Sequence, residues 1–405
     1  MPGYAISNRF IGLISDFSIS ILILIIFLFC LKKFIKKNNL NTNLVISLVV
    51  YRALIVLFML YYSSKTGVFD GHGIYNIAGP DYYTKFYPDS FNLKAYTGSD
   101  FLSFILRPLV NYLNLSFYSV SFIFFYLGTF GVLFCLKLYQ NLNLKSNFLK
   151  IFILAFCFNP SLNIFTSGIM KDTLIFFVTM LLLYLYFIKK YDLKYFILIS
   201  ILPLLFIYFI RPYLGGIVIF SIFTYFVLFS INLKIQNLVV LILLSLIVGF
   251  TFQTSINLYA WNYDGGLIEQ IVNFVKFRQY STNVGNTIMG YTNSDFFYRF
   301  FQSIFGFGVY KGGLFGPVFL YDQILSFYLF SLFLFLKLKT FKNLKNFYFK
   351  DYELLRLFII YSIGLYLLCS ISISNFGLIL RLKWMYWPII TFFIISLFQT
   401  NAKKI

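Results

Sequence analysis

Ionisable residues are scarce in this sequence. Only 11% of the 405 residues are charged and only 13 are Asp or Glu, whereas 60% are hydrophobic. A water-soluble domain of this length does not need so much apolar surface, so the composition argues against a soluble protein. The single histidine, His72, leaves no room for a His-based metal site. The four cysteines lie far apart, with neither a Cys-x-x-Cys pair nor metal-ligand spacing.

Long apolar runs dominate what is present. Most are near 20 residues long, which is the length that a helix needs to cross a hydrocarbon layer about 30 Å thick. We therefore expect an all-α, polytopic bundle of about eleven transmembrane helices. The expected spans lie near residues 11–31, 43–63, 116–136, 149–165, 173–188, 195–211, 214–232, 238–253, 316–336, 355–373 and 386–400. The first run is too long for a secretory signal, and Lys32-Lys33 follows it instead of a cleavage site.

Positive charge is concentrated on alternate connections between these spans. The connections after the odd-numbered spans, and the carboxyl-terminal segment, carry Lys and Arg with few acids. By the positive-inside rule, we expect the amino terminus outside and the carboxyl terminus inside. The net charge of +20 then reflects membrane orientation and contact with anionic membrane lipids, and not nucleic-acid binding.

Two outer connections are too long to be simple turns. Loop A covers residues 64–115 and loop B covers residues 254–315. Loops of this length in a compact protein are usually functional. The end of loop A, from Asp100 onward, has helical spacing but is too short to span, so we expect an interfacial helix there. We interpret residues 1–405 as a single integral membrane domain, with both loops folded over the outer mouth of the bundle.

The connection between the fourth and fifth expected spans, residues 163–172, ends in Lys171-Asp172. If these residues begin the next helix, an ammonium group, the positive helix end and backbone N–H donors converge, as an oxyanion or phosphate requires. The alternative is that Asp172 only caps the helix while Lys171 extends to the membrane surface.

Other cations lie near the expected outer surface. Arg211-Pro212 forms an outer turn with no adjacent acid, and arginine suits a two-pronged grip on phosphate or carboxylate. The alternative is an ion pair with Asp172 or a loop acid. Arg381 and Lys383 precede the last span; they point the same way if the segment is extended and diverge by about 160° if it is helical. The alternative is that Arg381 and Lys383 only extend to the membrane–water interface, beside aromatic residues that anchor the helix there.

Three charges fall inside the expected spans. Arg52 lies near the middle of the second span, where we expect a buried structural pair. Asp16 and Asp322 lie near outer span ends, where either could face the same cavity. In loop B, Arg278 and Arg299 are further candidate cations, although the sequence around each one by itself favours a solvated loop charge.

Taken together, these side chains favour a substrate with two halves. Clustered cations suit a lipid-linked phosphate or diphosphate whose chain stays in the bilayer, and aromatic faces suit sugar rings. The candidate stacking residues are Tyr82, Tyr83, Tyr259, Trp261 and Tyr263. The sequence has no nucleotide-binding loop, no Asp-x-Asp motif and no Ser/His/Asp set.

Three motifs, together with the hydropathy layout and the two outer loops, resemble a known family. They are Ser-Gly-x-x-Lys-Asp at 167–172, Arg-Pro at 211–212 and Asn-x-Gly-x-x-x-Arg-x-Lys at 375–383. The chain resembles the Wzy-type polymerases of bacterial O-antigen, capsule and exopolysaccharide repeat units. The resemblance implies a multi-pass protein of the bacterial inner membrane. It would transfer a growing glycan from undecaprenyl diphosphate onto the next lipid-linked repeat unit, on the outer face.

The resemblance also implies roles for residues and partners. In this family, outer-side arginines hold the diphosphates. By position, the matching cations here are Lys171, Arg211 and Arg381, with Lys383, Arg278 and Arg299 as further candidates. Loop B departs from the Arg-to-Gly spacing of better-known members. The implied partners are the undecaprenyl-diphosphate-linked oligosaccharide and membrane lipids, and the resemblance allows a chain-length regulator protein.

For the chemistry we expect displacement at an anomeric carbon, with cations stabilising the departing diphosphate and a carboxylate activating the acceptor hydroxyl. The candidate bases are Asp70, Asp81, Asp172 and His72. The adjacent Lys171 favours a positioning role for Asp172. We expect no cofactor and no metal, because the cations supply the positive charge.

Two other classes remain open. A GT-C-type glycosyltransferase using a polyprenyl-phosphate sugar, or an O-antigen ligase, would share the topology; the former usually keeps an acidic pair in its first outer loop. The non-enzyme alternative is a lipid-linked oligosaccharide transporter or flippase. It predicts broken helices and charges at mid-membrane depth on several spans.

Overall fold

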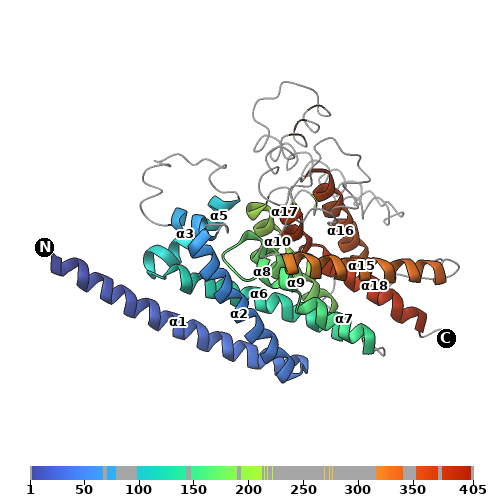
Figure 1. The fold of residues 1–405 in the computed structure, drawn as a ribbon, viewed down its shortest axis with the longest axis horizontal. Helices are drawn as coiled ribbons and strands as arrows, with labels where there is room; N and C mark the ends of the chain where they lie inside the picture. Colours follow the sequence, from blue (N-terminus) through green and yellow to red (C-terminus); the bar gives the residue numbers. More distant parts are fainter. Residues whose placement is uncertain are drawn as a thin grey trace. The chain divides into compact units, whose positions relative to one another are not determined.

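A computed structural model describes most of the helical part of the chain (Figure 1). The described residues are 2–66, 71–78, 98–142, 147–188, 193–211, 316–340, 353–372 and 376–402, with 214, 217, 221, 269, 273 and 276. Within these ranges the regular structure is entirely helical, and no strand occurs. The expected all-α class is therefore confirmed for the part that is described. The spans expected at 214–232 and 238–253 lie outside it.

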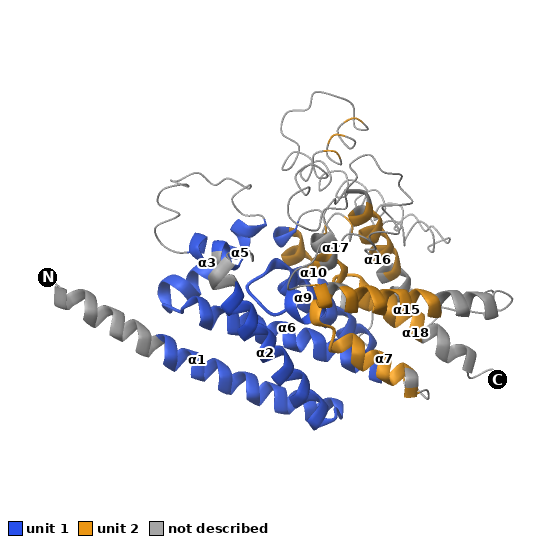
Figure 2. Cartoon of the chain, in the orientation of Figure 1, with its two compact units in different colours: residues 1–141, 162–203, 209–211 blue, residues 142–161, 204–208, 212–405 orange. Residues whose placement is uncertain are grey.

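The chain divides into two compact units (Figure 2). Unit 1 comprises Met1–Asn141, Leu162–Pro203 and Phe209–Arg211; unit 2 comprises Leu142–Ser161, Leu204–Tyr208 and Pro212–Ile405.

Three helices among the described residues are long and apolar enough to cross a membrane. They are Asp16–Asn38 within α1 (Pro2–Asn38), Thr42–Tyr62 within α2 (Thr42–Thr66), and α6 (Phe117–Gln140). At 1.5 Å per residue, their 23, 21 and 24 residues extend about 34, 31 and 36 Å, enough for a hydrocarbon core of about 30 Å. In such a layer a helix satisfies its own backbone hydrogen bonds, so runs rich in Leu, Ile and Phe form helices there.

The core of unit 1 forms where α6 packs against α9 (Lys171–Phe187). Gly131 of α6 permits this approach, because a Cβ atom there would lie 2.8 Å from the ring of Phe176. Further along, the rings of Phe134 and Tyr184 stack with centroids 4.9 Å apart. Inside a bilayer the hydrophobic effect does not drive helices together, because the lipid tails are as apolar as the side chains. Close packing between small and aromatic residues holds the helices together instead.

Both ends of the α1 span are held by hydrogen bonds to its neighbours. At one end, the Asp16 carboxylate accepts a 3.0 Å hydrogen bond from the backbone N–H of Ser116, which caps α6. At the other, Lys137 Nζ of α6 donates to Asn38 O (2.6 Å), and Tyr184 Oη of α9 donates to Asn38 Oδ1 (2.8 Å). The helices α1, α6 and α9 therefore run in the same direction, with their carboxyl-terminal parts close together.

Loop A contributes short helices to unit 1. They are α3 (Gly71–Ala78), α5 (Ser99–Arg107) and the π-helical turn η2 (Pro108–Tyr112). Ser103 of α5 donates to Ile74 O of α3 at 3.0 Å, and Leu102 and Leu106 are buried on the same helix. A helix is thus present where the sequence predicts a short one after residue 100.

The span expected at 149–165 is divided into α7 (Asn147–Cys157) and α8 (Pro160–Phe165). Pro160 explains the break, because the residue before a proline avoids helical dihedrals. That residue, Asn159, accepts a 2.8 Å hydrogen bond from Ser161 N through Oδ1 and so caps α8.

Four of the remaining helices lie near other expected spans. They are α10 (Leu193–Ile210), α15 (Gly316–Thr340), α16 (Glu353–Ser372) and α18 (Trp387–Ala402). The short helix α17 (Phe376–Lys383) lies in the stretch before the last expected span. In unit 2, α18 packs against α15 and α16.

Candidate functional site

Three helix ends from distant parts of the sequence meet in unit 1. Gly98 N, just before α5, donates a 2.8 Å hydrogen bond to Phe209 O near the end of α10, and the rings of Phe101 and Phe209 stack at 5.1 Å. Lys171 Nζ, at the start of α9, donates to Ser99 Oγ at 3.0 Å. We call the set Ser99, Asp100, Lys171, Asp172 and Arg211 the three-helix junction.

A buried ion pair lies within the junction. The Arg211 guanidinium donates through Nη2 to Asp172 Oδ1, and both side chains are buried. This is the ion pair that the sequence offers as the alternative role for Arg211. Because the Asp172 carboxylate is occupied by a guanidinium, it is better placed to position Arg211 than to accept a substrate proton.

Lys171 and Asp100 form the more accessible part of the junction. Both side chains are half-buried. Burial raises the pKa of the Asp100 carboxyl above its ordinary value, and the nearby Lys171 ammonium partly opposes this effect. Asp100 therefore holds a proton more readily than a solvated aspartate does.

The amino-terminal end of α9 adds positive potential to the junction. The preceding residue, Met170, is extended, and no side chain caps the helix. The first N–H groups of a helix carry a partial positive charge, which adds to the charge of Lys171. Asp172, in the first turn, compensates part of it.

Next to the junction, Arg52 fixes the connection between α8 and α9. Its buried guanidinium donates from Nε to Thr129 Oγ1 (3.1 Å), from Nη1 to Asn163 Oδ1 (2.5 Å) and Thr166 Oγ1 (3.2 Å), and from Nη2 to Thr166 O (2.8 Å). Gly128 makes the arrangement possible, since a Cβ atom there would lie 1.7 Å from Thr166 O. These four hydrogen bonds all go to neutral oxygens, and the guanidinium is fully buried, as a structural role for Arg52 requires.

These contacts place the connection deep within unit 1. Arg52 is the central residue of the Thr42–Tyr62 span, and Thr129 lies at the middle of α6, about 18 Å from its first residue. The sequence predicts the connection at the outer edge, whereas Arg52 holds Thr166 level with the middle of two spans. Irregular backbone is tolerated at such depth only where protein surrounds it, and Asn163, Thr166 and Ser167 are fully buried.

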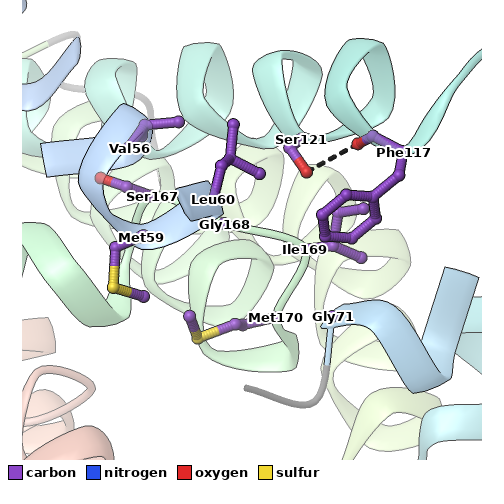
Figure 3. A pocket seen from close by; sticks show the side chains of 10 residues that line it. All are labelled: Val56, Met59, Leu60, Gly71, Phe117, Ser121, Ser167, Gly168, Ile169 and Met170. Atoms are coloured by element: carbon purple, nitrogen blue, oxygen red, sulfur yellow. Dashed lines mark hydrogen bonds between the residues drawn. The ribbon is translucent and has the colours of Figure 1, made fainter. Parts of the chain in front are cut away.

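A small pocket lies beside this connection (Figure 3). It holds about 330 Å³ of space, including its open mouth. The lining residues are Val56, Met59 and Leu60 of α2, Phe117 and Ser121 of α6, Gly71, and Ser167 to Met170. The Ser121 hydroxyl donates to Phe117 O (2.7 Å), which leaves an almost entirely apolar surface.

Unit 2 contains a separate buried charge network. Lys383 Nζ of α17 lies 2.6 Å from Asp322 Oδ2 of α15 and also donates to Ser326 Oγ. Asp322 Oδ1 accepts from Asn159 Nδ2 (3.2 Å) and Ser161 Oγ (2.9 Å). Each charged side chain is only 1% exposed, so the network is closed to a solvent-borne anion. A role in stabilising the fold therefore fits it better than anion binding.

Aromatic residues complete the network. Trp384 Nε1 donates to Ser161 Oγ at 3.1 Å, and Lys383 Nζ lies 4.6 Å from the centre of the Trp387 ring. Residues 376–383 are helical, so Arg381 and Lys383 diverge: Arg381 is half-exposed while Lys383 is buried. Lys171 and Arg211 belong to unit 1, whereas Arg381 and Lys383 belong to unit 2.

Several predicted site residues lie outside the described part of the chain. They are Asp70, Asp81, Tyr82, Tyr83, Tyr259, Trp261, Tyr263, Arg278 and Arg299. His72 lies in α3, but its side chain is not described. Their roles stay predictions. Among the described residues, no group of three or more His, Cys, Asp or Glu side chains could hold a metal ion.

Sequence reasoning did not assign Asp100 and Ser99 to the site. The sequence marks Asp100 only as the beginning of the expected interfacial helix, and the fold brings it beside Lys171, 71 positions later in the chain. The only available signal was an acidic residue in a loop rich in other candidates. Comparison with protein-family models, curated proteins and solved structures gave no match.

Proposed function

We propose that this chain is a multi-pass membrane polymerase of lipid-linked oligosaccharide repeat units. It would act at the outer face of the bacterial inner membrane, with about eleven transmembrane helices and the amino terminus outside. The substrate would be a glycan carried on undecaprenyl diphosphate. The product would be the same glycan lengthened by one repeat unit.

The observation that carries the proposal is the meeting of Lys171 and Arg211 at the three-helix junction. A half-buried ammonium, a guanidinium held by Asp172 and the uncapped start of α9 lie on helix ends tied to one another. Charge of this kind, fixed before the substrate arrives, stabilises a departing diphosphate without reorganisation. The arginine guanidinium can form two hydrogen bonds to a phosphate group at once, and the lysine ammonium attracts the diphosphate as a compact positive charge.

The distribution of charge in unit 1 supports the orientation. The carboxyl-terminal end of α1, with Lys36 and Lys37 in its last turn, lies beside Lys137 of α6 and Tyr184 of α9. Lys171 lies at the other end of α9, about 20 Å away along the helix axis. By the positive-inside rule, the end of unit 1 with Lys36, Lys37 and Lys137 faces the inside. The junction, at the opposite end of α9, then lies toward the outside.

The proposal gives the cations unequal roles. Lys171 would meet the diphosphate directly, and Arg211 would contribute a second donor while paired with Asp172. Lys383 is engaged in the buried unit 2 network, so we assign it a structural role. Arg381 is half-exposed and stays a candidate, together with Arg278 and Arg299 in loop B.

A first experiment tests Lys171 in cells. A strain from which the gene is deleted would receive the full chain or the Lys171→Ala, Lys171→Arg or Lys276→Ala variant, and glycan length would be read on a gel. We expect a ladder with the wild type, with Lys171→Arg and with Lys276→Ala, whose side chain is exposed. Lys171→Ala should lower polymer formation by about a hundredfold, as loss of an oxyanion donor does. A normal ladder from Lys171→Ala would remove the assignment.

A second experiment separates binding by Arg211 from its structural pairing. Arg211→Gln leaves Asp172 as a buried carboxylate, so loss of polymer in that variant alone is uninformative. The Asp172→Asn/Arg211→Gln pair removes both charges and should restore folding, measured as detergent-resistant monodisperse protein. A double variant that folds and polymerises normally would show that Arg211 has no part in substrate binding.

One group of observations favours a second candidate, a transporter or flippase of the same lipid-linked glycan. Transporter sites are built from broken helices near the middle of the membrane. Here α7 and α8 are separate, Pro203 lies inside α10, and Arg52 holds irregular backbone level with the middle of two spans.

An assay in vesicles separates the two candidates. The purified chain would be incubated with the lipid-linked glycan fraction extracted from the deletion strain. A ladder indicates the polymerase, and a single addition indicates a transferase or ligase. Glycan that only becomes accessible on the opposite leaflet indicates the transporter.

A further inference from the structure

Asp172 is the junction carboxylate that the sequence offers as one candidate base, but its surroundings do not suit a proton acceptor. It is buried, and its Oδ1 is bound to Arg211. A general base must come within hydrogen-bond distance of the hydroxyl that it activates. A carboxylate buried beneath a guanidinium has no open approach for a sugar hydroxyl.

Asp100 has the properties that Asp172 lacks. It lies in the first turn of α5 and is only half-buried, and no hydrogen bond to its carboxylate is seen among the described residues. Its neighbour Ser99 is bonded to Lys171, so the carboxylate is held beside the ammonium that would meet the diphosphate. The tie between Gly98 and Phe209 and the stacking of Phe101 on Phe209 fix α5 against the end of α10 that carries Arg211.

We propose that Asp100 is the general base of the transfer reaction, accepting the proton of the acceptor hydroxyl beside the diphosphate held by Lys171. This inference rests on the proposed polymerase function. The acceptor oxygen forms a bond to the anomeric carbon of the donor glycan, and the bond from that carbon to the diphosphate oxygen breaks. The electron pair leaves with the diphosphate, and the hydroxyl proton passes to the Asp100 carboxylate.

The local electrostatics agree with this role. Burial raises the pKa of Asp100, so the carboxylate is a stronger base than a solvated one, while Lys171 keeps it from being protonated too readily. The described charged groups of the junction are Lys171, Asp172 and Arg211, with Arg107 at the far end of α5. On α3, which packs against α5, the Tyr75 hydroxyl is engaged with Leu115 O.

Asp100→Asn tests the proposal, because it keeps the shape of the side chain and removes its basicity. Transfer would be measured with the full chain and the lipid-linked glycan extracted from the deletion strain, over a range of its concentration and of pH. We expect kcat to fall by about a hundredfold or more, with KM little changed and with loss of the rise in rate that wild type shows as Asp100 ionises. Asp100→Glu should recover much of the rate and keep a rise with pH. Glu269→Gln, which alters an exposed carboxylate, should match wild type.

The outcomes separate this inference from the proposed function. A wild-type chain that makes no polymer removes both. A wild-type chain that polymerises while Asp100→Asn keeps its rate and pH profile removes only the base assignment, and Asp70→Asn, Asp81→Asn and His72→Gln would then be compared in the same assay. Loss of rate in both Asp100→Asn and Asp100→Glu, with the wild-type pH profile kept in the residual activity, would also overturn it, because that pattern indicates a structural role.

Discussion

Lys383 and Asp322 form an ion pair that is sealed from solvent, with 2.6 Å between Nζ and Oδ2 and 1% of each side chain exposed. Breaking such a pair leaves an uncompensated charge in the protein interior. We expect Lys383→Met to lower the free energy of unfolding by about 3–5 kcal/mol. Thermal unfolding of the detergent-solubilised protein would measure the loss.

The double variant Asp322→Asn/Lys383→Met should recover most of that loss, because no charge is left buried. A double-mutant cycle gives the coupling energy of the pair. If the single and double variants polymerise in proportion to their folded fraction, the pair is structural. A folded double variant without activity would instead return Lys383 to the substrate site.

Gly128 allows α6 to approach the connection between α8 and α9. A Cβ atom at this position would lie 1.7 Å from Thr166 O and 2.7 Å from Arg52 Nη2, so the backbone would have to move. We expect Gly128→Ala to lower the free energy of unfolding by about 1–3 kcal/mol or more.

The matched control for Gly128 is Gly73→Ala in α3. That position has no atom within 4 Å of an added Cβ, so the variant should be neutral or slightly stabilising through helix propensity. Equal thermal stability of the two variants would contradict the close approach.

Arg52 should not be replaceable by lysine. Its guanidinium reaches Thr129, Asn163 and Thr166 from three nitrogens at once, whereas lysine offers a single point charge. We expect Arg52→Lys to cost at least about 2 kcal/mol, since hydrogen bonds to charged groups contribute about 1.5–3 kcal/mol each.

The effect of Arg52→Lys should be largest in the connection itself. Amide hydrogen exchange of residues 163–170 would measure it, and we expect exchange to accelerate there more than in the amino-terminal half of α1. Uniform acceleration throughout unit 1 would indicate a loss of global stability without a specific hold on the connection.

Asp100 should make stability and activity respond to pH in opposite directions. Because its pKa is raised in the folded protein, the folded state binds this proton more tightly than the unfolded state. Its contribution to stability is therefore present at low pH and is lost as pH rises through the raised pKa. Activity should increase over the same range as the carboxylate ionises.

The difference in melting temperature between wild type and Asp100→Asn isolates this effect from other titrating groups. We expect wild type to lose stability relative to the variant as pH rises above the ordinary pKa of an aspartate and through the raised pKa of Asp100. A difference that is constant with pH would show that Asp100 has the same pKa in the folded and unfolded states.

The sequence by itself determined the helical class and the location of most described helices, because apolar runs near 20 residues have few other stable forms in a bilayer. It also identified Lys171, Asp172 and Arg211 as unusual charges and named the Arg211–Asp172 ion pair as an alternative. Pro160 is a local signal for the break between α7 and α8, but the prediction of one span over 149–165 followed the apolar run and passed over it.

The tertiary structure decided which charges meet. Lys383 lies with Asp322, Arg52 reaches neutral oxygens across three helices, and Asp100 lies beside Lys171. Each of these pairings joins residues at least 61 positions apart. Pairing at that separation depends on how helices pack, and packing is fixed by contacts such as those of Gly128 and Gly131 that no local pattern reveals. The sequence shows which residues are charged, whereas only the fold determines which groups they contact.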